Sequence, residues 1–257
     1  MEIVKVPNSL GGLEKTGSES APDLVIKYLT EEIWTNEFGN KLNFKVNEIN
    51  VRNETDIKKV QSCISSSFKQ NSIYVGGDHS ITYSLFKPFV KLNPGAGIIS
   101  FDAHPDVYQT FDYPTQGDWL YYLIEEGHLK PENVIIVGIR SSAKEEIEYL
   151  QKKGIKYYPM KNLLDNRQNV CDSVMELARS FPALYLSIDI DIVDPAFAPG
   201  TGYIEPAGLS SRELLYFIQR LKLLKNIKCA DLVEINPGKD VNDMTSKLGA
   251  KILGELL

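Results

Sequence analysis

Short runs of β-branched residues alternate with helix-patterned segments along the whole chain, and this alternation constrains the fold more than any other feature. The runs expected to form strands are Ile3–Val6, Phe44–Ile49, Ile73–Val75, Gly97–Phe101, Val134–Ile139, Ile155–Tyr158, Leu184–Ile190 and Cys229–Ile235. The segments with helical apolar spacing are Ala21–Ile33, Glu54–Gln70, Ile81–Val90, Trp119–Glu126, Ala143–Lys152, Val170–Arg179, Arg212–Leu223 and Val241–Leu257. Strands joined by helices run parallel, so the pattern predicts an α/β fold with a mostly parallel sheet covered on both faces.

No long linker rich in Gly, Pro or Ser interrupts this series, and no repeat with a period of roughly 20 to 50 residues is found. A chain of 257 residues can bury roughly three quarters of its unfolded surface. We therefore expect a single domain over residues 1–257. In an open parallel sheet the ligand crevice lies beyond the carboxyl ends of the strands, so functional residues are expected there.

Charge and composition argue against several classes of function. The net charge is −6 and no run of five Lys or Arg residues occurs, which is atypical of a nucleic-acid-binding protein. No stretch approaches about 18 uninterrupted apolar residues, and the amino terminus does not resemble a signal peptide, so we expect a cytoplasmic protein without membrane contact. The three cysteines, Cys63, Cys171 and Cys229, are expected to be buried thiols.

A cluster of potential metal ligands follows the expected strand Gly97–Phe101. In an extended segment alternate side chains share one face, so Asp102, His104 and Asp106 can converge on one point. Two carboxylates and an imidazole held together without a cation would suffer mutual repulsion and desolvation. A divalent ion removes both penalties, so this cluster predicts a metal site.

Two further clusters stand at the ends of other expected strands. Asp189 and Asp191 close the apolar run Leu184–Ile190, where isolated carboxylates would be costly. His79 follows Ile73–Val75 within a Gly-rich turn, and a lone histidine in that position is more often a structural cap than a ligand.

Together these clusters contain more ligands than one four-coordinate zinc ion can use. Two ions that share bridging carboxylates account for the set better. Oxygen-rich ligands with some imidazole favour Mn²⁺ over zinc, which predicts two Mn²⁺ ions per chain. The six predicted metal ligands are His79, Asp102, His104, Asp106, Asp189 and Asp191.

At these residues the chain resembles the ureohydrolase family of arginases, agmatinases and formimidoylglutamases. Residues 76–80, 102–106 and 189–195 are similar to its three metal motifs, and the likeness extends from Gly11 to the carboxyl terminus. The resemblance implies an arginase-like αβα sandwich around an eight-stranded sheet. It also implies one Mn²⁺ on His79, Asp102, Asp106 and Asp189, and a second on Asp102, His104, Asp189 and Asp191.

The same resemblance assigns a substrate-binding and catalytic role to Glu234, which precedes Ile235-Asn236-Pro237 and would hold a guanidinium group. Hydrolysis would proceed by attack of a hydroxide that the two ions activate, with Asp191 or Asp106 handling a proton. The expected products are urea and an amine.

Two positions bear on the substrate. Arginases usually carry Asn where this chain has Tyr108, and this difference favours a substrate without an α-carboxylate, most similar to agmatine, which yields putrescine. The family often places a proton-shuttling histidine where this chain has Gln116, a residue that cannot titrate. Gln116 is therefore expected to act only by hydrogen bonding to the substrate or the leaving group.

Several alternatives stay open at this point. The substrate can be arginine, formimidoylglutamate or another guanidino acid, and Gln116 also allows a metal-binding homologue with impaired catalysis. A single-zinc deacetylase of a related fold would need only an Asp, a His and another Asp. The resemblance further implies a homotrimer or homohexamer, a small cationic guanidino substrate and no nucleic-acid partner.

Overall fold

The computed structural model describes residues 2–13, 17–164 and 166–257. Within these ranges the strands are β1 (Glu2–Val6), β2 (Lys45–Glu48), β3 (Ser72–Gly76), β4 (Gly97–Phe101), β5 (Val134–Val137), β6 (Lys156–Tyr158), β7 (Leu184–Asp189) and β8 (Ile227–Val233). The α-helices are α1 (Ala21–Glu31), α2 (Ile57–Ser66), α3 (Ile81–Leu92), α4 (Trp119–Glu125), α5 (Lys144–Lys153), α6 (Arg167–Arg179), α7 (Ser211–Leu221) and α8 (Met244–Leu256). Each predicted strand and helix is present, with bounds that differ by at most four residues.

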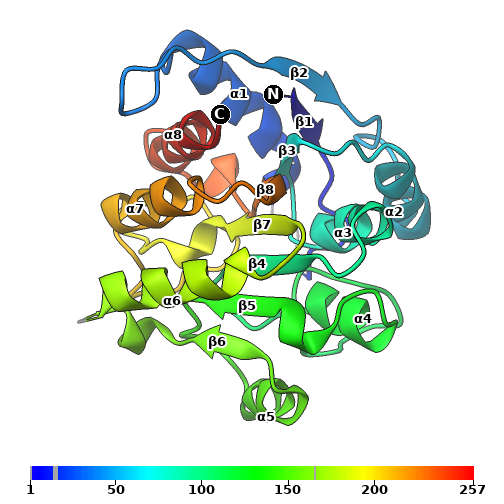
Figure 1. The fold of residues 1–257 in the computed structure, drawn as a ribbon. Coiled ribbons are helices and arrows are strands. Elements are labelled where there is room, and N and C mark those ends of the chain that lie inside the picture. Colours follow the sequence, from blue (N-terminus) through cyan, green and yellow to red (C-terminus); the bar gives the residue numbers. More distant parts are fainter. Residues whose placement is uncertain (1, 14–16, 165) are drawn as a thin grey trace.

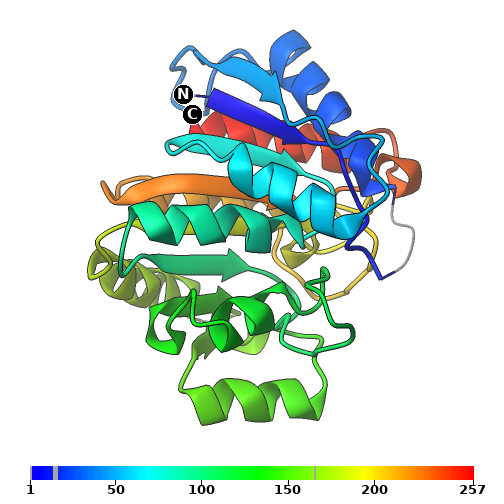
Figure 2. The ribbon, with the colours of Figure 1, turned by 90° about the vertical axis from the view of Figure 1, so that its right-hand side faces the viewer.

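The strands form one eight-stranded sheet in the order β2-β1-β3-β8-β7-β4-β5-β6. Each neighbouring pair is parallel, and the strand arrows point the same way in Figure 2. From β3 the chain crosses to β4, and it later returns to fill the gap between them with β7 and β8. Loops diverge at such a reversal of strand order, so a ligand crevice is expected beyond the carboxyl ends of these four central strands.

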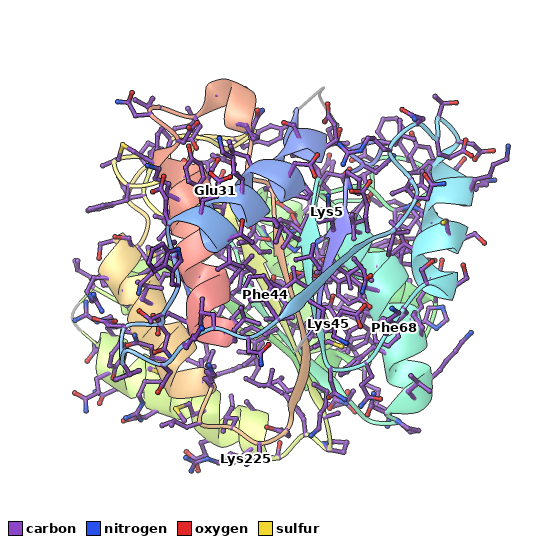
Figure 3. All side chains as sticks on the ribbon, turned by 90° about the horizontal axis from the view of Figure 1, so that it is seen from above. Lys5, Glu31, Phe44, Lys45, Phe68 and Lys225 are labelled. Atoms are coloured by element: carbon purple, nitrogen blue, oxygen red, sulfur yellow. The ribbon has the colours of Figure 1, made fainter. Side chains whose placement is uncertain are left out.

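Helices cover both faces of the sheet and give the predicted three layers (Figure 1). α1, α6, α7 and α8 pack on one face, and α2, α3 and α4 pack on the other. Neighbouring strand residues alternate between the two cores: Ile98 contributes to the core beneath α2 to α4, and Ile99 to the opposite core. Figure 3 shows both helix layers from the β2 edge, with Lys5 and Lys45 marking β1 and β2 between them.

Side-chain caps explain where two of the helices begin. Asp56 accepts hydrogen bonds from the amides of Lys58 and Lys59, so α2 starts three residues later than its apolar spacing predicts. Ser210 and Glu213 form a reciprocal capping box at the start of α7. None of the described helices has both the length and the apolar character needed to cross a membrane.

Candidate metal centre

The central strands β3, β8, β7 and β4 bring every predicted metal ligand to one edge of the sheet. His79 follows β3, the segment 102–106 follows β4, and Asp189 and Asp191 stand at the end of β7. Glu234 follows β8 and reaches the same region, because its Oε1 accepts a hydrogen bond from the backbone amide of His79 at 2.7 Å. Residues that are up to 155 positions apart in the chain therefore form one site.

The first cluster surrounds the imidazole of His79, which is buried with only 1% of its surface exposed. Its Nδ1 lies 3.2 Å from Asp102 Oδ2, 3.1 Å from Asp106 Oδ2 and 3.1 Å from Asp189 Oδ2. This buried nitrogen has no hydrogen-bond partner among the described residues. One proton cannot satisfy three carboxylates, whereas a divalent cation between them can, so the donor set fits a metal ion.

The second cluster surrounds His104, which lies at the border of the site. Its Nδ1 is 3.0 Å from Asp191 Oδ2 and 3.5 Å from Asp102 Oδ1. Asp102 therefore directs one carboxylate oxygen to each imidazole. The two groups whose ligand atoms converge are His79, Asp102 and Asp189, and Asp102, His104 and Asp191. Two adjacent clusters that share a carboxylate are consistent with a binuclear centre.

Turns bring the metal ligands together. The sequence prediction had instead placed them on one face of extended strand ends. β4 ends at Phe101, and Asp106 adopts a left-handed backbone with φ of 54°. β7 ends at Asp189 and passes into a 3₁₀ turn over Ile190–Ile192. In that turn the amide of Asp191 donates to Asp189 Oδ1 at 2.8 Å. The structure brings the six predicted ligands to one site, but it places Asp106 beside His79 and His104 beside Asp191 rather than Asp102, His104 and Asp106 at one point. The extended geometry proposed for them is wrong, because polar side chains cap the strand ends and turn the chain.

The electrostatics of the site favour a bound cation. Burial would lower the pKa of His79, but Asp102, Asp106 and Asp189 outweigh it and raise the pKa well above the ordinary value. Burial and the nearby Asp191 raise the pKa of Asp189 well above the usual range, and burial with Asp102 raises that of Asp106 to about 7. The metal-free cluster therefore keeps protons that a divalent ion would displace.

A cavity of about 190 Å³ opens beside both clusters. Five carboxylates, Asp106, Glu146, Asp189, Asp191 and Glu234, belong to its lining, and no Lys or Arg is found among its described lining residues. The remaining lining residues are Leu13, His104, Tyr108, Thr110, Gln116, Gly117, Thr201 and Tyr203. The cavity is thus suited to a small cation rather than to an anion.

Two buried acceptors of this cavity lack a hydrogen-bond partner among the described residues: Glu234 Oε2 and Gln116 Oε1. Burial, together with Asp78, raises the pKa of Glu234 well above its ordinary value. Its backbone is left-handed, with φ of 66°, which turns the side chain back toward His79. Unpaired buried acceptors are costly, and a ligand rich in N–H groups would satisfy both.

Gln116 and Tyr108 lie on the long loop between β4 and α4. The buried carboxylate of Asp118 ties this loop together by accepting from Thr115 N at 2.6 Å and Thr110 N at 3.0 Å. Gln116 is buried, whereas 53% of Tyr108 is exposed. The structure therefore places Gln116 within the cavity wall and Tyr108 at its mouth.

A model of the arginase family matches residues 1–257. The chain belongs to the arginase family. Over 188 residues it is 35% identical to arginase 1, mitochondrial, of Oryza sativa subsp. indica, a match that covers 72% of this chain and 54% of that protein. It is 35% identical to a formimidoylglutamase of Halalkalibacterium halodurans (70% and 58% covered) and 33% identical to an agmatinase of Bacillus cereus (71% and 61% covered). The matches thus span little more than half the length of these relatives.

Solved structures of arginase-family proteins share the fold. The formimidoylglutamase from Bacillus subtilis superposes with a TM-score of 0.93 at 25% identity, covering 99% of this chain and 85% of that one. The arginase from Bacillus subtilis superposes with a TM-score of 0.86 at 25% identity, covering 100% of this chain and 98% of that one. The predicted arginase-like sandwich is confirmed. The names of these relatives are divided among three activities, so the comparisons support the family without a preference for agmatinase.

One buried network of this arginase-family chain escaped the sequence analysis. Asp231, in the middle of β8, accepts hydrogen bonds at 2.7 Å from Ser187, Thr82 and Tyr185. Ser187 Oγ also lies 2.9 Å from His79 Nε2. Because Ser187 donates to Asp231, it accepts from Nε2–H, and in the neutral ring this leaves the Nδ1 lone pair facing the carboxylates. An aspartate inside an apolar strand was the sequence signal for this network.

We expect Asp231→Ala to lower the free energy of unfolding by about 3 kcal/mol, because it leaves three buried hydroxyl donors without their acceptor. Tyr185→Phe removes one of these bonds and should cost about 1 kcal/mol. Urea denaturation of the metal-free variants measures both values. A smaller loss for Asp231→Ala than for Tyr185→Phe would contradict this role.

Proposed function

We propose that this chain is a hydrolase of linear guanidino or amidino compounds that works with two Mn²⁺ ions. The observation that carries the proposal is the buried Nδ1 of His79, which faces three carboxylate oxygens without a hydrogen bond. His79, Asp102, Asp106 and Asp189 would hold one ion, and Asp102, His104, Asp189 and Asp191 the other. When bound, the ions would supply an acidified water as nucleophile and would stabilise developing negative charge.

Glu234 would bind the planar cation. Its Oε1 accepts a hydrogen bond from the His79 amide. Its Oε2 has no hydrogen-bond partner among the described residues, and Glu234 lines the cavity, so an N–H of the substrate can pair with Oε2. This contact would align the reacting carbon with the metal clusters and exclude other orientations. Binding a cation also offsets the cost of the buried carboxylate.

Gln116 and the cluster aspartates would complete the site. The free Oε1 of Gln116 would accept a hydrogen bond from the substrate or the leaving amine, and the side chain cannot titrate. Asp106 and Asp191 both line the cavity, and Asp191 or Asp106 would take up and release the proton during hydrolysis.

Within this class we propose agmatine as the substrate and putrescine and urea as the products. The acidic lining favours a substrate with two positive charges. A substrate carboxylate would find no Lys or Arg among the described lining residues, and Tyr108 stands where arginases usually carry Asn. Formimidoylglutamate is the second candidate, favoured by the TM-score of 0.93 to the Bacillus subtilis formimidoylglutamase.

A substrate panel tests this proposal. Mn²⁺-loaded protein is incubated with agmatine, arginine, 4-guanidinobutyrate and formimidoylglutamate, while urea, or formamide for the last, is measured. We expect agmatine to give the highest kcat/KM and arginine a value at least about tenfold lower, equivalent to ~1.4 kcal/mol. If only formimidoylglutamate is hydrolysed, with release of formamide, it replaces agmatine as the proposed substrate. If no compound gives a product, the proposed activity is refuted.

A homotrimer or homohexamer in the cytoplasm stays a prediction of the family resemblance. Sedimentation of the purified chain would distinguish these assemblies from a monomer.

A further inference from the structure

Trp119 makes a contact with the candidate metal centre that no ligand motif contains. It is the first residue of α4 and is completely buried. Its indole Nε1–H donates a hydrogen bond to Asp106 Oδ2 at 2.6 Å. Its ring centroid lies 4.8 Å from that of His79, with the two planes inclined by 37°. One side chain therefore contacts two members of the His79 cluster.

The oxygen that accepts this bond is the one that faces the cluster. Asp106 Oδ2 lies 3.1 Å from His79 Nδ1 and is the acceptor of the Trp119 hydrogen bond. A carboxylate oxygen has two lone pairs, so it can accept the indole N–H and still direct a lone pair toward an ion. The bond fixes the orientation of the carboxylate while leaving its ligand function available.

The other cluster carboxylates are held by backbone amides. Asp102 Oδ1 accepts from His104 N at 2.6 Å, Asp189 Oδ1 from Asp191 N at 2.8 Å, and Asp191 Oδ1 from Ala103 N at 3.1 Å. Asp106 differs because its donor is a side chain from another element, and its own backbone has left the strand conformation. A point substitution can therefore remove this support selectively.

We propose that Trp119 is a positioning residue, whose indole N–H holds the Asp106 carboxylate toward His79 and so sets the affinity of the His79 cluster for a divalent ion. This role rests on the metal centre of the proposed function. Groups that orient a metal ligand typically change metal affinity by about 10- to 100-fold. The cluster around His104 contains neither Asp106 nor Trp119 and would be unaffected.

Trp119→Phe tests the proposal, because it removes the N–H and keeps an aromatic ring against His79. Mn²⁺ titration, with free Mn²⁺ followed by electron paramagnetic resonance, should show one ion bound about 10- to 100-fold more weakly and the other unchanged. Trp34→Phe is the matched control, since Trp34 is 69% exposed and lies outside the site. Two ions bound as tightly as in this control would overturn the proposal.

A second variant covers the case in which Trp119→Phe does not fold. Replacing Trp119 with 3-benzothienylalanine keeps the bicyclic shape and substitutes sulfur for N–H, so the same selective weakening is expected. An unchanged affinity for both ions in this variant would likewise overturn the proposal.

A spectroscopic measurement tests the hydrogen bond itself. The sequence contains two tryptophans, so the Trp34→Phe chain carries Trp119 alone. Its single indole ¹H–¹⁵N resonance should lie downfield and move upfield when Asp106→Ala is added. A resonance that does not respond to Asp106→Ala would exclude the bond.

The outcomes separate this proposal from the proposed function. If the wild type binds two Mn²⁺ ions and Trp119→Phe weakens one of them, but no substrate is hydrolysed, the positioning role holds and the proposed activity fails. If the wild type binds no Mn²⁺, the positioning role and the proposed metal centre fail together.

Discussion

Asp102→Asn is expected to abolish tight binding of both metal ions and to lower kcat/KM by at least about a thousandfold, equivalent to ~4 kcal/mol of transition-state stabilisation. The reason is that Asp102 directs Oδ2 to His79 and Oδ1 to His104, so one substitution affects both clusters. Metal analysis after dialysis, together with the rate of urea release, measures the two effects.

Asp194→Asn provides the control for this prediction. Asp194 belongs to the same sequence segment as Asp189 and Asp191, but its oxygens accept from the amides of Ala196 and Gly208 and belong to neither metal cluster. This variant should keep both ions. Retention of two ions by Asp102→Asn would refute the shared-carboxylate arrangement.

Glu234→Gln is expected to keep both ions and to lower kcat/KM by about a hundredfold or more, equivalent to ~2.7 kcal/mol. The substitution keeps the acceptor for the His79 amide but removes the charge that would pair with the substrate cation. Glu132→Gln is the matched control, because Glu132 is exposed and is not a lining residue of the cavity. Comparable losses in the two variants would contradict the role of Glu234.

The same substitution has a predicted pH signature in the metal-free protein. Burial and Asp78 raise the pKa of Glu234 in the folded state, so the folded chain binds a proton that the unfolded chain releases above about pH 4.3. The free energy of unfolding of the wild type therefore falls as pH rises above that value. In Glu234→Gln there is no carboxyl group at this position to titrate, so this decrease is absent. Glu234→Gln should be the more stable chain at pH 7, and the difference should shrink toward pH 4.

The sequence predicted the architecture because local patterns of apolar residues indicate the order of strands and helices. Parallel strands separated by helices need only apolar periodicity and turn residues to be recognised, and each such segment is present in the fold. The exact ends of the helices were harder to predict, because a cap such as Asp56 acts through side-chain hydrogen bonds and leaves no trace in the apolar periodicity.

The candidate site was predictable to the extent that its residues are close in sequence. Asp102, His104 and Asp106 attract notice as a polar group after an apolar strand, although the turn that brings them together was not foreseen. Asp231 and Trp119 were missed because their partners lie on other elements, and only the folded chain brings Asp231 to Ser187 and Trp119 to Asp106. The substrate stayed open, since it depends on the shape of the cavity rather than on any motif.

The central claim is a binuclear metal centre, and metal stoichiometry tests it most directly. Metal-free wild-type protein is titrated with Mn²⁺ and studied by electron paramagnetic resonance. We predict two ions per chain and the spectrum of a spin-coupled pair, because the two clusters share Asp102. One isolated Mn²⁺ per chain, or a single tightly bound Zn²⁺ that excludes a second ion, would contradict the claim.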